Sequence, residues 1–396
     1  MRRIVMSGLV MLAAVLGGGA SAATAAAAPA PTASAVSFLP GKISCGAPKA
    51  CLAVGTDVND NSGAEAPVAE KWNGTAWKSV AVKTPKGKNV AELTGVSCKS
   101  ATSCLVVGVD GSTSGSGGDL PYALTWNGTS LTPTAAPPVP KGARVVILDA
   151  VSCVTAKSCV AVGIALASTA LLVVETWNGA KWTLHTAKSP GTGAFAQLAG
   201  IRCFSVTSCV VVGESFSSAP QAKMLVATWN GKTFTAMKAA APAGAGDLAL
   251  NAVSCASAKR CVAAGLSLNS AGTGGFGFTE AWNGTSWTAH KVAWPKRDTE
   301  SYLQGVSCVT QANCVAVGSA GASGSDTAKA LSYNGTTWAL RNVPGPGAGN
   351  ASAFTDVSCP KANDCVAFGV TGPADGSAGK PLAGLWNGTS WRLAIA

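Results

Sequence analysis

Fourteen cysteines divide this chain of 396 residues into seven similar frames, and every cysteine belongs to a pair with five residues between the partners. The first cysteine of a pair recurs every 50 to 55 residues. Self-similarity at this period is typical of solenoids and propellers. The seven pairs are Cys45 with Cys51, Cys98 with Cys104, Cys153 with Cys159, Cys203 with Cys209, Cys255 with Cys261, Cys308 with Cys314, and Cys359 with Cys365.

The cysteine pairs could be disulfides or metal ligands. Zinc sites usually combine four Cys and His ligands, but His185 and His290 are the only histidines. The N-terminus also has the basic, apolar and small-residue order of a secretory signal peptide, which implies an oxidising compartment. We therefore predict seven local disulfides, each within one copy, and neither a metal nor a cofactor.

The same N-terminal pattern defines the domain organisation. Residues 1–22 read as the signal peptide, 23–36 as an Ala- and Pro-rich leader, and 37–396 as the repeat domain. No later stretch offers about 20 uninterrupted apolar residues, so no membrane span is expected. These features predict a secreted, extracellular protein, and we expect a monomer.

Each copy reads as four strands, for example residues 148–153, 159–163, 171–177 and 182–186 in the third. The cysteine pair brackets the first hairpin. An Asn-Gly pair preceded by an aromatic residue recurs in all seven copies and predicts a type I′ turn between the third and fourth strands. Seven four-stranded antiparallel sheets arranged radially expose only short edges, so the expected fold is an all-β, seven-bladed β-propeller.

The order of strands, with the second ending in Val-Gly and a Gly-containing hairpin closed by Trp, resembles the Asp-box (BNR) propeller repeats of sortilin-type receptors and photosystem assembly factors. The Trp-Asn-Gly-Thr-Ser-Trp segments are also similar to secreted actinobacterial propellers. The residue that names the Asp box is replaced here by Trp72 and its counterparts, with Tyr333 in the sixth copy. The resemblance implies architecture and carries over no functional residue.

Three features have competing interpretations. The repeated Trp residues suit packing between blades better than sugar stacking, because they recur at one position of every copy. Five Asn-Gly-Ser/Thr sequons occur, but two copies lack the hydroxyl residue, so the turn is the shared requirement. Asp57 to Gly63 alternates oxygen ligands as a calcium loop does, but it lacks that loop's Gly and Glu, and we favour a solvated turn.

No nucleophile, carboxylate pair or arginine cluster is recognisable in the sequence, and both histidines should lie in outermost strands. Sialidases share Asp-box repeats but need converging arginines and a tyrosine. The leading hypothesis is a secreted, non-enzymatic binding or scaffold propeller with an unknown extracellular ligand, either a glycan or a cell-surface protein. The alternative is a carbohydrate-active hydrolase or lyase on the same fold.

Binding is expected on the face formed by the connections between the second and third strands and between blades, because these differ in every copy. Trp294 lies outside the repeat in a charged loop and is the favoured exposed aromatic contact. The candidate ligand contacts are Asp57, Asp60, Lys86, Lys88, Asp110, Trp294, Arg297 and Asp298.

The mature charge of +9 comes from 27 basic and 18 acidic residues after removal of Arg2 and Arg3 with the signal. Basic residues form no run longer than a pair, which argues against a nucleic-acid groove. The charge is interpreted as a source of solubility and of weak attraction to an anionic cell surface.

Overall fold

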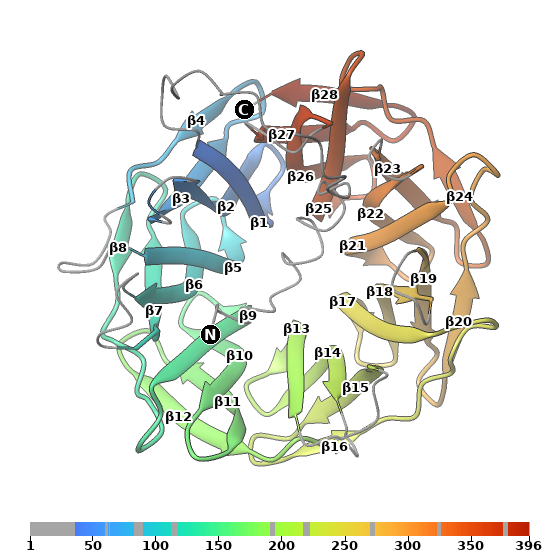
Figure 1. Cartoon of the computed structure of the whole chain (residues 1–396). Helices are drawn as coiled ribbons and strands as arrows, with labels where there is room; N and C mark the ends of the chain where they lie inside the picture. The colour runs from blue at the N-terminus through green and yellow to red at the C-terminus, as the bar shows by residue number, and fades with distance from the viewer. Residues whose placement is uncertain are drawn as a thin grey trace, which may run out of the picture.

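The computed structural model describes residues 36–59, 62, 64–82, 90–111, 118–190, 195–216, 222–269, 274–322, 326–374 and 379–395. These residues form seven four-stranded antiparallel sheets arranged as blades around one axis (Figure 1). The fold is therefore the predicted all-β seven-bladed propeller. The signal peptide and all but the last residue of the leader lie outside the described residues.

Each blade takes four consecutive strands, numbered from the axis outwards. Blades 1 and 2 contain β1 (Val36–Ala47), β2 (Ala50–Asn59), β3 (Glu65–Trp72), β4 (Trp77–Ser79), β5 (Val90–Ser100), β6 (Ser103–Gly111), β7 (Leu120–Trp126) and β8 (Leu131–Pro133). Blades 3 and 4 contain β9 (Val145–Thr155), β10 (Ser158–Leu166), β11 (Ala170–Trp177), β12 (Trp182–Ala187), β13 (Phe195–Ser205), β14 (Ser208–Phe216), β15 (Lys223–Trp229) and β16 (Phe234–Ala236). Blades 5 and 6 contain β17 (Asp247–Ser257), β18 (Arg260–Leu268), β19 (Gly275–Trp282), β20 (Trp287–Lys291), β21 (Glu300–Thr310), β22 (Asn313–Gly321), β23 (Thr327–Tyr333) and β24 (Trp338–Arg341). Blade 7 contains β25 (Asn350–Lys361), β26 (Asp364–Pro373), β27 (Lys380–Trp386) and β28 (Trp391–Ile395).

All seven predicted disulfides are present, and each joins the first two strands of one blade. The two Cα atoms of each pair are 3.9 to 4.0 Å apart. No cysteine of the chain is free. The sequence prediction of one staple per first hairpin is therefore confirmed for every pair. The bonds join Cys45 to Cys51, Cys98 to Cys104, Cys153 to Cys159, Cys203 to Cys209, Cys255 to Cys261, Cys308 to Cys314, and Cys359 to Cys365.

The Asn-Gly turn differs from the predicted type I′ geometry. Trp72 pairs with Trp77, so four residues separate the paired aromatics rather than two. Asn73 keeps a negative φ and only Gly74, at φ 97°, enters the left-handed region. The Asn73 carboxamide oxygen instead accepts the N–H groups of Thr75 and Ala76 at 2.9 Å. This side-chain cap recurs in all seven blades. It explains why the Asn is also present in the two copies that lack a glycosylation sequon.

A bulge in the innermost strand explains the glycine that ends the apolar part of each second strand. Gly163 pairs with Leu148 while Val162 pairs with Ala150, which leaves Asp149 as an extra residue. A Cβ on Gly163 would lie 1.8 Å from the Ile147 carbonyl oxygen, so the position accepts only glycine. The bulge recurs in every first strand.

The core lies between neighbouring blades. Val160, Val162 and Leu172 of blade 3 pack with Leu198, Val211 and Trp229 of blade 4 in one buried cluster. Trp229 is 1 % exposed, and each described blade pairs its two repeated aromatics or apolar residues across the third and fourth strands. The repeated Trp positions therefore serve packing between blades, as the sequence indicated.

The ring closes by packing blade 7 against blade 1, with no strand exchanged between them. Phe38 of β1 packs edge-on against Phe368 of β26, with ring centroids 5.8 Å apart. The Ile43 N–H donates to the Asp356 carboxylate at 3.0 Å, and the Thr355 hydroxyl donates to the Gly41 carbonyl at 3.1 Å.

A serine before the first cysteine joins successive blades. The inner edge of each first strand has no neighbouring strand, so its N–H groups need other acceptors. The N–H of the first cysteine donates to the serine hydroxyl of the preceding blade at 2.9 to 3.0 Å in six of the seven interfaces. The closing bond, from Cys45 to Ser358, is one of these six. At the seventh interface, Arg202 replaces the serine that would face Cys255.

Candidate functional site

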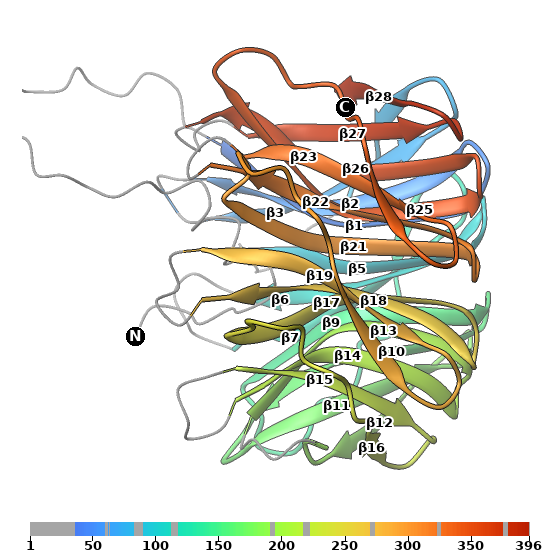
Figure 2. The ribbon, with the colours of Figure 1, turned by 90° about the vertical axis from the view of Figure 1, so that its right-hand side faces the viewer.

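The ring has two faces of different construction, seen edge-on in Figure 2. The turn face holds the hairpin turns between the first and second strands and the Asn-Gly turns, and Gly179 lies directly against the Lys157 side chain there. The loop face holds the other connections. Some of their described residues contact the next blade, as where the Leu248 N–H donates to the Ala222 carbonyl at 3.0 Å. The second strand of blade 3 extends further towards the loop face than the predicted residues 159–163, because β10 continues to Leu166.

Two of the predicted contacts, Arg297 and Asp298, come together on the loop face between blades 5 and 6. Residues 295–298 form a tight turn in which the Asp298 N–H donates to the Pro295 carbonyl at 2.9 Å. The Arg297 side chain is 84 % exposed, whereas the Asp298 side chain is 5 % exposed. Arg297 Nε lies 3.9 Å from Asp298 Oδ1, so the exposed guanidinium stands above a buried carboxylate.

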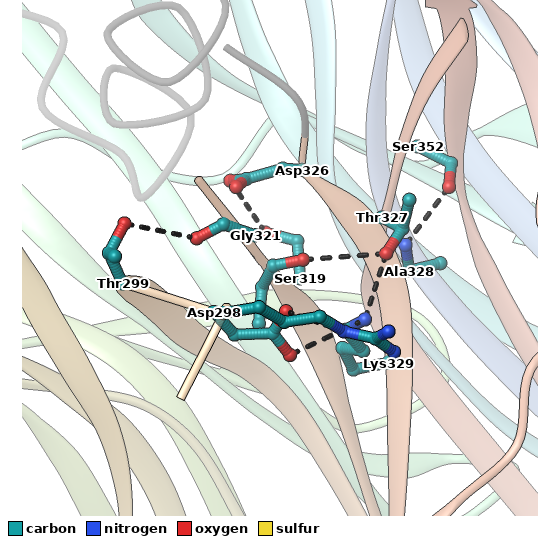
Figure 3. A network of polar contacts seen from close by, with 11 residues as sticks. Asp298, Thr299, Ser319, Gly321, Asp326, Thr327, Ala328, Lys329 and Ser352 are labelled. Carbon is teal, nitrogen blue, oxygen red and sulfur yellow. Dashed lines mark hydrogen bonds and ion pairs between the residues drawn. The ribbon is translucent and has the colours of Figure 1, made fainter. Parts of the chain in front are cut away.

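Asp298 is anchored by Lys329 of β23 (Figure 3). Lys329 Nζ lies 3.6 Å from Asp298 Oδ2 and donates to the Thr327 hydroxyl at 2.9 Å. The Thr299 hydroxyl lies 3.5 Å from the Gly321 carbonyl, which ties the same connection to the end of β22. Removing either member of such a buried ion pair would leave an uncompensated charge. The connection that carries Arg297 is therefore held rigidly.

A second carboxyl, Asp326, lies at the start of β23 in the same group (Figure 3). Asp326 is 2 % exposed, accepts a 3.4 Å hydrogen bond from Ser319 on Oδ2, and has no hydrogen-bond partner for Oδ1. Burial, followed by the negative charge of Glu300, raises the pKa of Asp326 to about 6, although the Ser319 bond and Lys329 act in the opposite direction. Its carbonyl accepts the Ser352 N–H at 3.0 Å, so it also links blade 6 to blade 7.

Glu300 and Tyr302 of β21 extend this group. The Tyr302 hydroxyl donates to Glu300 Oε2 at 3.0 Å. Burial and then the charge of Glu300 raise the pKa of Tyr302, which keeps the phenol protonated and unsuited to nucleophilic attack. Of the arginines in the described residues, Arg297 lies in this group, while the others belong to other blades or to outer strands, namely Arg144, Arg202, Arg260, Arg341 and Arg392.

Trp294 is half-buried, not the freely exposed aromatic that its charged surroundings suggested. Its indole N–H donates to the Gly277 carbonyl at 3.5 Å, and its ring packs on the cluster formed by blades 5 and 6. A Cβ on Gly277 would lie 3.4 Å from the Trp294 ring. Trp294 therefore packs beneath the connection between blades 5 and 6, whereas the Arg297 side chain is exposed to solvent.

Asp57 and Asp110, the remaining predicted contacts that the structure describes, do not join this group. Asp57 pairs with Phe38 and Ala66 inside blade 1, and burial raises its pKa. Asp110 lies in β6 opposite Ala91 and Leu120 of blade 2. Asp60, Lys86 and Lys88 lie outside the described residues.

Calcium binding by residues 57–63 gains no support from the described part of that segment. Asp57 belongs to β2, and the Asn59 side-chain oxygen accepts the Ser62 N–H at 2.9 Å in a local turn. Asp60, Asn61 and Gly63 are outside the described residues. Among the residues that are described, no group of three or more His, Cys, Asp or Glu side chains could hold a metal ion.

The axis holds a cavity of about 150 Å³ lined by first-strand residues of all seven blades. Its walls are mainly small or apolar, such as Gly95, Ala150 and Ala252, and Lys42 and Asp356 are its charged members. Asp356 already accepts the Ile43 N–H in the ring closure, and its burial raises its pKa. A charged residue of the axial cavity, Asp356, therefore already serves to close the ring. The polar residues around Arg297, Asp298, Asp326 and Lys329 are the better candidate site.

Sequence reasoning missed Asp326, Lys329 and the interblade serines. The serines could have been found, because Ser precedes the first cysteine in six of the seven copies. Asp326 and Lys329 carry no such signal, because they lie in a connection and a strand that differ from copy to copy.

No protein-family model and no curated protein matches the sequence. Solved propellers of varied function resemble the structure at low identity. A structure of YCF48 bound to D1 peptide is 13 % identical with a TM-score of 0.48, covering 85 % of this chain and 90 % of that one. The β-propeller domain of the Trilobed protease from Pyrococcus furiosus is 8 % identical with a TM-score of 0.48, covering 91 % and 97 %. An acylaminoacyl peptidase from Pyrococcus horikoshii is 9 % identical with a TM-score of 0.50, and the match covers 90 % of this chain and 52 % of the peptidase. At these identities the likeness extends to the fold alone.

The seven disulfides are typical of a protein that folds in an oxidising environment. None of the residues that the structure describes belongs to a helix of the length and apolarity needed to cross a membrane.

Proposed function

We propose that the protein is a secreted, non-enzymatic binding propeller whose extracellular partner, a glycan or a cell-surface protein, docks on the loop face across blades 5 to 7. The observation that carries this proposal is the exposed Arg297 on a rigid connection. Its neighbour Asp298 is locked by Lys329, so Arg297 can contact a partner with little ordering of the backbone. Arginine on a fixed support is a frequent source of binding energy in interfaces.

The proposal includes cleavage of residues 1–22, a leader over residues 23–36, a monomeric mature protein and no nucleic-acid ligand. An Asp-box-like ancestry is consistent with it. Of the other predicted contacts, Trp294 supports the connection that carries Arg297, whereas Asp57 and Asp110 of blades 1 and 2 would meet only a partner that extends across the ring.

A carbohydrate-active enzyme is the second candidate, because the Tyr302 hydroxyl and the Glu300 carboxylate are in contact. Two observations weigh against it. The pKa of Tyr302 is raised rather than lowered, and the arginines that would hold an acidic sugar are spread over several blades.

The test is a screen of the mature protein against a glycan array and purified cell-wall polymers, followed by Arg297→Ala. Affinity for any ligand found should fall about thirtyfold, which corresponds to the roughly 2 kcal/mol at the lower limit of an interface hot spot. The matched control is Arg392→Ala, since Arg392 is exposed on β28 of blade 7 away from the group. Equal affinity for both variants and the parent would exclude this site, and turnover of a glycan would favour the enzyme.

A further inference from the structure

The turn face gathers basic residues that are dispersed along the sequence. It consists of the seven segments between paired cysteines and the seven four-residue Asn-Gly loops, all of which are described. These segments contain eight basic residues and one acidic residue, Asp364, a net charge of +7. The basic residues are Lys49, Lys99, Lys157, Lys181, Lys232, Lys259, Arg260 and Lys361.

All seven of these lysines are exposed, and together with Arg260 they come from six of the seven blades. These residues lie far apart in the sequence, because successive copies are about fifty residues long. The ring brings their charges to one end of the molecule. Buried or half-buried carboxyls are found at the opposite end, where Glu214, Asp298 and Asp326 lie on the loop face. Exposed basic residues such as Lys223, Arg297 and Lys380 also lie on the loop face. The turn face differs in that Asp364 is the only acidic residue among its eight basic ones.

The lysines project from backbone that is already fixed. Each hairpin is closed by a disulfide, and each Asn-Gly loop is capped by its Asn side chain. The aliphatic part of Lys157 lies within 3.1 Å of where a Cβ on Gly179 would be, and Lys259 covers Gly284 in the same way. Glycine at these loops leaves room for the lysine stems, whose ammonium groups extend towards solvent.

We propose that the turn face docks on an anionic phospholipid bilayer and so directs the loop face away from the membrane. The charges form a ring on the flat end of a disc rather than line a groove. A planar surface of phosphate groups can meet lysines of several blades at once, whereas a single linear polyanion would have to follow the ring to do so. Each lysine close to an anionic bilayer adds to the attraction, and salt screens it.

The docking is independent of the loop-face function proposed above, because it uses the opposite end of the ring. The probe is a set of vesicles containing about 30 % phosphatidylglycerol in phosphatidylcholine, compared with vesicles of phosphatidylcholine alone, in a flotation assay at low salt. The mature protein should float with the anionic vesicles only, and about 0.5 M NaCl should release it.

The variant is the triple change Lys99→Gln, Lys157→Gln and Lys259→Gln, which keeps much of each stem. Its partition onto the anionic vesicles should fall by at least about tenfold, since each lysine near such a surface contributes about a fivefold factor. The matched control changes three exposed lysines away from the turn face, Lys188→Gln, Lys223→Gln and Lys380→Gln, and should stay within about twofold of the parent. Because all six side chains are exposed, both variants should have the same melting temperature as the parent protein.

Chemical acetylation of the vesicle-bound protein gives a second readout. Lys99, Lys157 and Lys259 should be protected from the reagent, while Lys223 and Lys380 should remain reactive. No binding to the anionic vesicles, equal binding to phosphatidylcholine alone, or equal loss in both triple variants would overturn the proposal. Binding of soluble polyphosphate without binding of vesicles would also overturn it and assign the face to a polyanion in solution.

Discussion

The turn face and the loop face of this ring are built from the same seven repeats but by opposite means. On the turn face every copy uses the same disulfide and the same Asn cap. On the loop face the described side-chain contacts vary along the ring, with the Asp298–Lys329 pair at one place, the Asp247 carboxylate accepting the Ala222 N–H at another, and the Ser352 hydroxyl accepting the Ala328 N–H at a third. Repetition supplies stability at one end, and variation at the other leaves room for recognition.

The contrast predicts that stability depends mainly on the turn face. The chain-entropy model gives about 2 kcal/mol for a loop as short as each disulfide closes, so full reduction of the seven should lower the free energy of unfolding by roughly 14 kcal/mol. Denaturant titration with and without reductant measures this loss. A fully reduced protein with the stability of the oxidised form would mean that the staples do not stabilise the ring.

A smaller effect should come from carboxyls buried between blades. Glu175 and Glu280 are fully buried, and neither has a hydrogen-bond partner for its carboxyl oxygens. Burial raises the pKa of each from the usual 4.5 to about 8. The folded state therefore holds protons that the unfolded chain releases, and stability should be highest below about pH 4.5 and be lost as the pH rises towards 8. The slope should approach about 1.4 kcal/mol per pH unit for each group.

The chain provides its own control for this titration, since Leu124 and Leu331 occupy the corresponding place in blades 2 and 6. The double variant Glu175→Leu, Glu280→Leu should flatten the dependence of stability on pH between about 5 and 8. Denaturant titrations at about pH 5, 6.5 and 8 test this, and an unchanged slope would assign the pH dependence to other groups, such as Asp149, whose pKa burial also raises.

The smallest effect should come from one Asn cap. Asn178 accepts the N–H groups of Ala180 and Lys181 at 3.0 and 2.9 Å and belongs to a copy without a sequon. Asn178→Ala should cost about 1 to 2 kcal/mol by removing both bonds. Asn178→Asp keeps the acceptor and should lose less, as thermal denaturation would report. Equal losses would show that the amide nitrogen, and not the oxygen, is what the turn requires.

The fold was predictable from the sequence because every repeat contains the same local signals for its two hairpins. Cysteine spacing located the first hairpin, and the paired aromatics located the second. The prediction failed on the turn type, because Asn-Gly alone does not tell whether two or four residues separate Trp72 and Trp77. It also made the second strand of the third copy too short, since strand ends on the loop face have no repeated signal.

The candidate site was less predictable. Arg297 and Asp298 were found because their connection departs from the repeat, but Lys329 lies in an ordinary strand and meets them only through the packing of blade 6. The interpretation of Trp294 as exposed missed its contact with Gly277 for the same reason. Contacts between blades depend on side chains that are far apart in sequence, and a single copy does not reveal them.

Amide hydrogen exchange at the first cysteine of each blade tests the closed ring most directly. Six of these N–H groups, including that of Cys45, donate to a serine of the preceding blade, whereas Cys255 faces Arg202. If blade 7 closes on blade 1 as the other blades join, the Cys45 amide should exchange as slowly as those of Cys98 and Cys308, and Cys255 should exchange faster. A Cys45 amide that exchanges as fast as Cys255 would contradict closure and indicate an open ring.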